Sequence, residues 1–158
     1  MRSRILFVII SILVTGCISV EICDDDNNSV MVAKFMTMKD ELPADSTVAS
    51  LSVYGIREGK PDSLLYNNQP SVNAFELPLD PHHDYSRFVL QVDTLTDTLE
   101  LMHTQELYLI SYDCGFGNVF TLDNNPGYSG GLIKSAEIKD ETVDALTEED
   151  DVHIWLFL

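Results

Sequence analysis

The sequence predicts an all-β protein folded as a single antiparallel β-sandwich, and three observations support this prediction. Apolar and polar residues alternate along much of the chain, which is the pattern of strands that bury one face. Segments rich in Pro, Gly, Asn and Asp separate these stretches, as turns separate strands. No segment shows a convincing helical period. An immunoglobulin-like arrangement is one form of such a sandwich, and a barrel is the alternative.

About nine strands are expected, at residues 30–37, 47–56, 71–79, 86–93, 97–103, 106–114, 118–123, 132–139 and 152–158. Alternation predicts a buried face for four of them, formed by Leu51 and Val53, by Phe75, Leu77 and Leu79, by Phe88, Leu90 and Val92, and by Leu99 and Leu101. The same rule places Tyr108, Ile110 and Tyr112 on an inner face. The final strand is apolar on both faces, so we expect it to complete a sheet.

The N-terminal residues have the order of a secretory signal peptide. Arg2 and Arg4 precede an apolar run of about ten residues, whereas a membrane-spanning helix needs roughly 20. The run ends in Val14-Thr15-Gly16-Cys17, which resembles the lipobox of bacterial lipoproteins. This resemblance implies that residues 1–16 are removed and that Cys17 receives the lipid, with acyl chains such as palmitate holding the protein to a membrane.

The expected mature chain has 158 − 16 = 142 residues, a length that suits one domain. We expect a lipidated, acidic tether at residues 17–29 and a β-sandwich domain at residues 30–158. The net charge of −17 makes nucleic acid an unsuitable partner, because binding a polyanion requires clustered Lys and Arg. Anionic lipid surfaces would also repel the chain.

Two cysteines remain once Cys17 carries lipid. Cys23 and Cys114 form an even pair in a chain exported to an oxidising compartment, so a disulfide between them is expected. Two buried free thiols are the alternative. If the bridge forms, only five residues separate it from the lipid, and they span at most about 18 Å. The domain would then lie close to the bilayer.

One motif invites a catalytic interpretation. Gly127-Tyr128-Ser129-Gly130-Gly131 has the spacing of a hydrolase nucleophile elbow and resembles the serine loop of trypsin-like proteases, which makes Ser129 the candidate nucleophile. An elbow needs a strand before the serine and a helix after it. Here a turn with Pro126 precedes the motif and a strand is expected after it. Glycines that adopt positive φ angles explain the loop more simply.

An acidic segment near the N-terminus begins like a calcium-binding loop. Asp24, Asp26 and Asn28 alternate as oxygen ligands do in such a loop. Ser29 then stands where the loop needs glycine, and Phe35 stands where it needs the closing glutamate. We expect a solvated segment here.

Histidines supply the other candidate ligands. His82 and His83 lie next to Asp84, but neighbours in a turn seldom converge on one ion, so a solvated turn is expected. His103 and His153 lie among apolar residues of expected strands and should be buried. No metal and no cofactor is predicted.

A resemblance to a known family rests on Cys23-Asp24-Asp25, Asp97-Thr98-Leu99, Tyr112-Asp113-Cys114-Gly115, Phe120-Thr121-Leu122, Ile138, Val143-Asp144 and His153-Ile154-Trp155-Leu156-Phe157. In these segments the chain is similar to a family of Bacteroidetes lipoproteins of unknown function. The resemblance implies one all-β domain and favours the pairing of Cys23 with Cys114. It implies no activity, substrate or catalytic residue.

Together these observations predict a non-enzymatic lipoprotein of the bacterial cell envelope, anchored by its lipid, with the outer membrane as the expected location. Its β-sandwich is expected to bind another envelope protein or a glycan. A serine hydrolase that uses Ser129 is one alternative, and a structural spacer without a specific ligand is the other.

Overall fold

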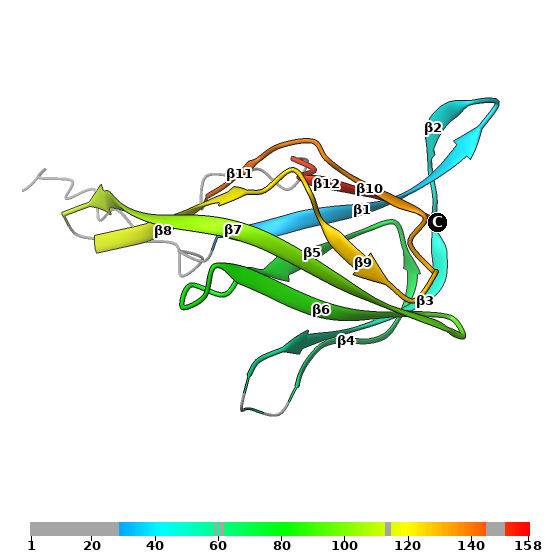
Figure 1. Ribbon diagram of the computed structural model, residues 1–158, viewed down its shortest axis with the longest axis horizontal. Helices are drawn as coiled ribbons and strands as arrows, with labels where there is room; N and C mark the ends of the chain where they lie inside the picture. Colours follow the sequence, from blue (N-terminus) through cyan, green and yellow to red (C-terminus); the bar gives the residue numbers. More distant parts are fainter. Residues whose placement is uncertain (1–28, 59, 61, 113–114, 145–150) are drawn as a thin grey trace, which may run out of the picture.

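The computed structural model describes residues 29–58, 60, 62–112, 115–144 and 151–158, and this part of the chain is all-β (Figure 1). Its strands are β1 (Val30–Lys39), β2 (Leu42–Asp45), β3 (Val48–Ile56), β4 (Ser63–Val72), β5 (Ala74–Pro78), β6 (Tyr85–Val92), β7 (Leu95–Ser111), β8 (Gly115–Leu122), β9 (Gly127–Ser129), β10 (Ser135–Ile138), β11 (Thr142–Val143) and β12 (Ile154–Phe157). Within these residues, no helix is long and apolar enough to cross a membrane.

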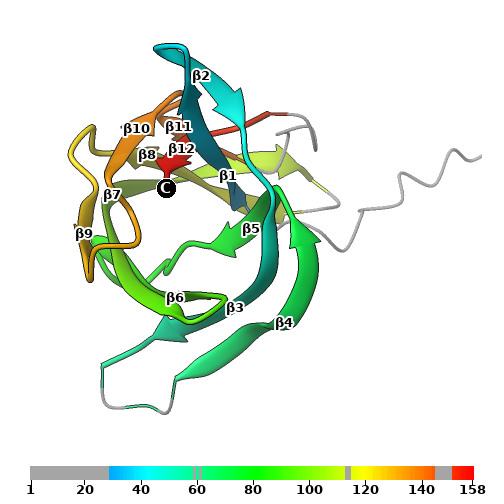
Figure 2. The ribbon, with the colours of Figure 1, turned by 90° about the vertical axis from the view of Figure 1, so that its right-hand side faces the viewer.

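The strands form two sheets that face each other as a sandwich (Figure 2). The first sheet has the order β10-β12-β1-β2, with β5 also paired to β1, and the second has the order β11-β8-β7-β6-β3-β4, with β9 paired to β7. The predicted all-β sandwich is confirmed. One pair departs from the antiparallel expectation: β1 and β12 run parallel, with Ala33 opposite Ile154 and Met36 opposite Phe157.

A hydrophobic core fills the space between the two sheets. The inner faces predicted from alternation are confirmed, because Leu51, Val53, Leu77, Leu90 and Leu99 are completely buried. Burying one such side chain stabilises the fold by roughly 1.5–3 kcal/mol. The core therefore holds both sheets in place and positions the turns at their ends.

The strand count rises from about nine to twelve in the described residues because several elements were not predicted. The largest is β4, whose central residues Asn67 to Pro70 are exposed at the edge of the second sheet and show no apolar alternation. Conversely, the two strands expected at residues 97–103 and 106–114 are one strand, β7. It continues through Thr104 and Gln105 because these residues pair with β8.

The end of the β7–β8 hairpin corrects one further expectation. Tyr112 was predicted to face the core, yet it is 97% exposed. The register shifts between Leu109 and Ser111, and beyond it the two strands pair only with each other among the described residues. No sheet lies opposite this end of the hairpin. The side chains that continue the alternation of Leu99 and Leu101 are therefore not buried there.

Candidate functional site

An open hollow of about 540 Å³ lies between the β5–β6 turn and the middle of β7. We call it the turn hollow; its lining residues are Pro81, His82, His83, Asp84, His103, Thr104 and Gln105. The turn takes its shape from the sequence. Asp80 Oδ1 accepts the backbone N–H of His82 at 2.9 Å, and Pro81 fixes its own φ between them, which is the usual construction of an Asx turn.

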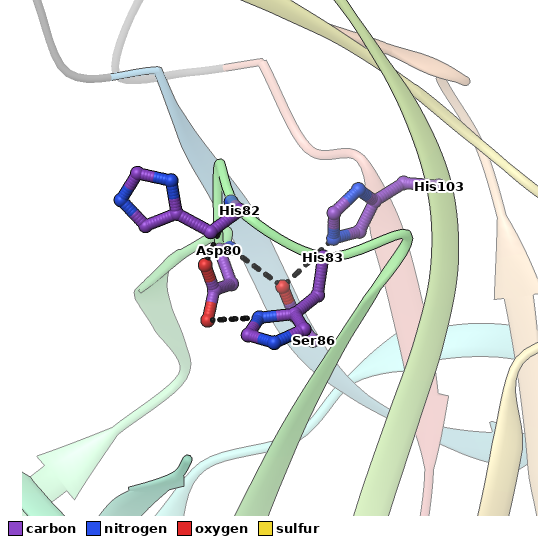
Figure 3. A network of polar contacts seen from close by, with 5 residues as sticks. All are labelled: Asp80, His82, His83, Ser86 and His103. Carbon is purple, nitrogen blue, oxygen red and sulfur yellow. Dashed lines mark hydrogen bonds and ion pairs between the residues drawn. The ribbon is translucent and has the colours of Figure 1, made fainter. Parts of the chain in front are cut away.

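A chain of polar contacts lies behind this hollow (Figure 3). The backbone N–H of Asp80 donates to Ser86 Oγ at 2.7 Å, and Ser86 Oγ lies 2.9 Å from His103 Nε2. Ser86 and His103 are both 3% exposed. The backbone N–H of His103 in turn donates to the Asp84 carbonyl at 3.0 Å, so β7 is tied to both ends of the turn.

Burial determines the protonation state of His103. It lowers the pKa of this imidazole, while the charges of Asp80 and Asp84 act in the opposite direction and only partly offset the effect. The ring packs edge-on against Phe120, with centroids 5.1 Å apart. Its Nδ1 has no hydrogen-bond partner among the described residues. His103 is therefore neutral at neutral pH, and it lines the turn hollow as an uncharged residue.

His83 is held differently, because it lies on the exposed side of the same turn. Its Nδ1 is 3.1 Å from Asp80 Oδ2 (Figure 3), and its ring centroid is 5.6 Å from that of Tyr85. Burial acts to raise the pKa of Asp80, but the hydrogen bonds from His82 and His83 and the charges of their imidazoles lower it overall. Asp80 therefore stays ionised and fixes the turn.

The contact between Ser86 and His103 does not form a catalytic pair. A nucleophilic serine must reach its substrate, and its histidine is normally oriented by a third group. Ser86 is buried and already accepts the N–H of Asp80, and no described group orients His103 Nδ1. The groups that the turn hollow does expose are those of His82, His83, Asp84 and Thr104. They suit hydrogen bonding to a polar ligand.

Ser129, the nucleophile candidate from the sequence, does not stand in a nucleophile elbow. It is exposed in β9, paired with Thr98, and the chain continues through a turn into strand β10 instead of a helix. Gly130 and Gly131 have φ angles of +118° and +85°, which confirms the interpretation of the loop as one that requires glycine.

The loop after Ser129 is held by a buried carboxylate that the sequence did not single out. Asp97 Oδ2 accepts the backbone N–H groups of Leu132 and Ile133 at 3.0 and 2.9 Å. A Cβ atom at Gly130 would approach the Thr96 carbonyl oxygen to 2.6 Å. The glycine therefore lets the loop pass close to β7, where Asp97 fastens it.

The cysteines predicted to carry lipid and to form a disulfide, Cys17, Cys23 and Cys114, lie outside the described residues, as do residues 24–28 of the acidic segment. The nearest described contact is a hydrogen bond from Ser29 Oγ to the backbone carbonyl of Asn118. The chain therefore enters β1 beside the β7–β8 hairpin.

His153 is buried, as the sequence predicts, and it ties β1 to the segment that leads into β12. Its Nδ1 accepts the backbone N–H of Val32 at 3.0 Å. Burial lowers the pKa of this imidazole, against the opposing effects of Asp140, Asp151 and a hydrogen bond with the backbone of Thr142. Protonation at Nδ1 would remove the acceptor for Val32, so the neutral form is part of the fold.

Acidification is expected to weaken the fold through His153. Because the folded-state pKa lies below the usual value of 6.5, the unfolded state binds more protons below pH 6.5. The contribution of His153 is complete above that pH and decreases as the pH falls through the lowered value. His153→Gln keeps an acceptor but takes no proton, so it should lose less stability between pH 7 and pH 5 than the wild type in urea titrations. His82→Gln, a substitution at an exposed histidine, serves as control. If the free energy of unfolding changed equally with pH in all three proteins, His153 would not be the residue responsible.

Two polar residues of the network were not singled out as a pair from the sequence. Ser86 shares the inward alternation of Phe88 and Leu90, and His103 shares that of Leu101. A buried polar side chain needs a hydrogen-bond partner. Two polar residues on the inner faces of neighbouring strands are therefore the sequence pattern from which their contact could have been predicted. Within the described part of the chain, no three His, Cys, Asp or Glu side chains gather in a way that would hold a metal ion.

Comparisons with known proteins identify the family. Residues 50–157 match the family of unknown function DUF6452, whereas no curated protein and no solved structure matches the chain. The match spans more than half of the sequence and covers β4 to β12, including every residue that lines the turn hollow. The chain therefore belongs to the family of unknown function DUF6452.

Proposed function

We propose that the protein is a lipid-anchored, non-enzymatic binding module of a bacterial cell envelope, and that its ligand is a glycan held in the turn hollow. The observation that carries this proposal is the composition of the hollow. It is open and about 540 Å³ in volume, and six of its seven lining residues have a polar side chain. Ligand sites commonly have volumes of about 300–1,000 Å³.

A glycan suits these groups better than an apolar ligand. Sugar hydroxyls both donate and accept hydrogen bonds, and the hollow offers a carboxylate at Asp84, a hydroxyl at Thr104 and an amide at Gln105. The Gln105 amide is held in place, because its Nε2 donates to Asn118 Oδ1 at 2.7 Å. Imidazoles such as His82 add both a flat ring and a ring nitrogen.

The anchor is supported by the sequence alone. Arg2 and Arg4, the short apolar run and Val14-Thr15-Gly16-Cys17 stand in the order that lipoprotein processing requires. A non-enzymatic role is supported by the burial of Ser86 and by the position of Ser129 in β9, where neither serine is paired with an accessible histidine in the described residues.

Glycan binding is tested with the full chain extracted from bacterial membranes, after intact mass has established whether Cys17 carries lipid. On an array of envelope glycans, the wild type should bind at least one structure, and Asp84→Ala should weaken that binding about tenfold, since a charged hydrogen bond contributes roughly 1.5 kcal/mol or more. Asp62→Ala removes another exposed aspartate, one that lies before β4 and outside the turn hollow, and should bind like the wild type. No binding by the wild type, or equal loss in both variants, would contradict the proposal.

A further inference from the structure

The β7–β8 hairpin ends in a group of exposed apolar side chains. Leu107, Leu109 and Phe116 are 69%, 46% and 67% exposed, and Tyr112 beside them is 97% exposed. We call these four residues the hairpin tip. Leu107 and Leu109 alternate onto one face of β7, and Phe116 lies directly opposite Leu109 on β8. Contiguous apolar side chains of this kind mark interaction or membrane surfaces in soluble proteins.

The opposite face of the hairpin is packed against itself. Tyr108 and Ile110 are half-buried, and both lie over Gly117, where a Cβ atom would approach Tyr108 Cε1 and Ile110 Cδ1 to 3.0 Å. The absence of a side chain at Gly117 therefore lets these two residues cover the back of the hairpin. The hairpin keeps its shape without a second sheet, and its apolar face points to the outside.

Charge distinguishes this end from the rest of the molecule. The chain contains 26 acidic residues and has a net charge of −17, yet Asp113 is the only charged residue between positions 107 and 119 in the sequence. Exposed edge strands in soluble proteins usually carry charges that prevent unwanted pairing. In this segment that protection is limited to Asp113, and none of the four residues of the hairpin tip is charged, which favours a partner that is itself apolar.

The position of the hairpin relative to the N-terminal part of the chain indicates which partner this is. Ser29 Oγ donates to the backbone carbonyl of Asn118, so the described part of the chain begins beside the hairpin, with 28 residues before it in the sequence. Eleven residues separate Ser29 from Cys17, and they span at most about 40 Å. If Cys23 is bridged to Cys114, the five residues between Cys17 and Cys23 keep the lipid within about 18 Å of the bridge.

We propose that the hairpin tip inserts its apolar face into the bilayer interface to which the lipid on Cys17 anchors the chain. The inference rests on the lipid anchor of the proposed function. Leu107, Leu109 and Phe116 would enter the boundary between head groups and acyl chains. Tyr112 suits the same depth, because a tyrosine has an apolar ring and a polar hydroxyl. A zwitterionic surface fits best, since anionic lipids repel the acidic domain.

Quenching of a single tryptophan by brominated lipids tests this insertion. The chain has one tryptophan, so Trp155→Phe provides a background in which Phe116→Trp places the only indole at the hairpin tip. Leu42→Trp in the same background is the matched control, because Leu42 is 68% exposed and lies on β2 at the opposite end of the molecule (Figure 1). Both full-length proteins are purified from bacterial membranes, checked for lipid by intact mass and for folding by circular dichroism, and placed in phosphatidylcholine vesicles.

Brominated acyl chains should reduce the fluorescence of Trp at position 116 about twofold, because interfacial apolar faces reach roughly 5–10 Å into the bilayer, and should leave position 42 unchanged. Equal quenching at both positions, or none at position 116 in the lipidated protein, would overturn the insertion. Blue-shifted emission at position 116 before vesicles are added, without quenching afterwards, would show that protein covers the tip and would also overturn it. A chain without lipid at Cys17 would overturn the anchor itself, whereas lost glycan binding with quenching intact would overturn only the function of the turn hollow.

Discussion

Replacing Asp97 by alanine is expected to lower the free energy of unfolding by about 3–5 kcal/mol, because the change leaves two buried backbone N–H groups and a third, half-buried one without an acceptor. Asp97 is 1% exposed. Its Oδ2 serves Leu132 and Ile133, and its Oδ1 accepts the N–H of Thr98 at 2.8 Å. Water does not reach the buried N–H groups of Leu132 and Ile133 to replace these bonds, so the variant should unfold at a much lower urea concentration than the wild type.

Two variants make this expectation specific. Asp97→Asn keeps the shape of the side chain and one acceptor oxygen. Its free energy of unfolding should therefore lie between that of the wild type and that of the alanine variant. Asp123 also accepts a backbone N–H, that of Asn125 at 2.9 Å, but it is exposed. Asp123→Ala should therefore lower the free energy of unfolding by less than about 1 kcal/mol, since water replaces the lost acceptor. Similar urea midpoints for Asp97→Ala and Asp123→Ala would show that burial of the carboxylate does not matter.

Breaking the predicted bridge between Cys23 and Cys114 is expected to have an effect of similar size. A cross-link across 114 − 23 = 91 positions restricts the unfolded chain enough to contribute roughly 4–5 kcal/mol. The hydrogen bond from Ser29 to Asn118 supports the pairing. Only five residues separate Cys23 from Ser29 and three separate Cys114 from Asn118, and these segments span at most about 18 and 11 Å. These spans bring both cysteines within chain reach of Asn118, as the predicted bridge requires.

The bridge is tested by alkylating the unfolded protein without reductant and measuring its intact mass. No alkylated thiol is expected once Cys17 carries lipid, and two would show that the bridge is absent. Cys23→Ser, Cys114→Ser and the double variant should be destabilised equally, because each removes the same cross-link. Different losses for the two single variants would instead indicate separate contacts of two free thiols.

The fold was predictable wherever one face of a strand is buried. Leu77 and Leu90 are buried because every second side chain of their strands points into the core. The alternation of apolar and polar residues in the sequence therefore predicts their burial directly. The edge strand β4 was missed for the opposite reason. Asn67, Asn68 and Pro70 pack against nothing that selects for apolar residues, and only pairing with β3 makes this segment a strand.

The candidate site was less accessible to prediction because it depends on register between distant strands. The sequence placed His82 and His83 in a turn and His103 in a buried position, and the structure agrees on both points. What alternation does not supply is the alignment that brings Ser86 opposite Leu101 and so within reach of His103. The turn hollow forms only when that alignment is set.

The parallel pairing of β1 with β12 determines the order in which the protein can acquire its structure. Val32 and His153 are 121 positions apart, so the contact that joins them requires closure of almost the whole described chain. Contacts of such separation form slowly, because the entropy of loop closure is lost before any pairing energy is gained. A growing chain lacks β12 until residues 154–157 have been made, and until then β1 has no partner on that side. The first sheet is therefore completed only after residues 154–157 have been made, and a chain that stops before them leaves one side of β1 unpaired.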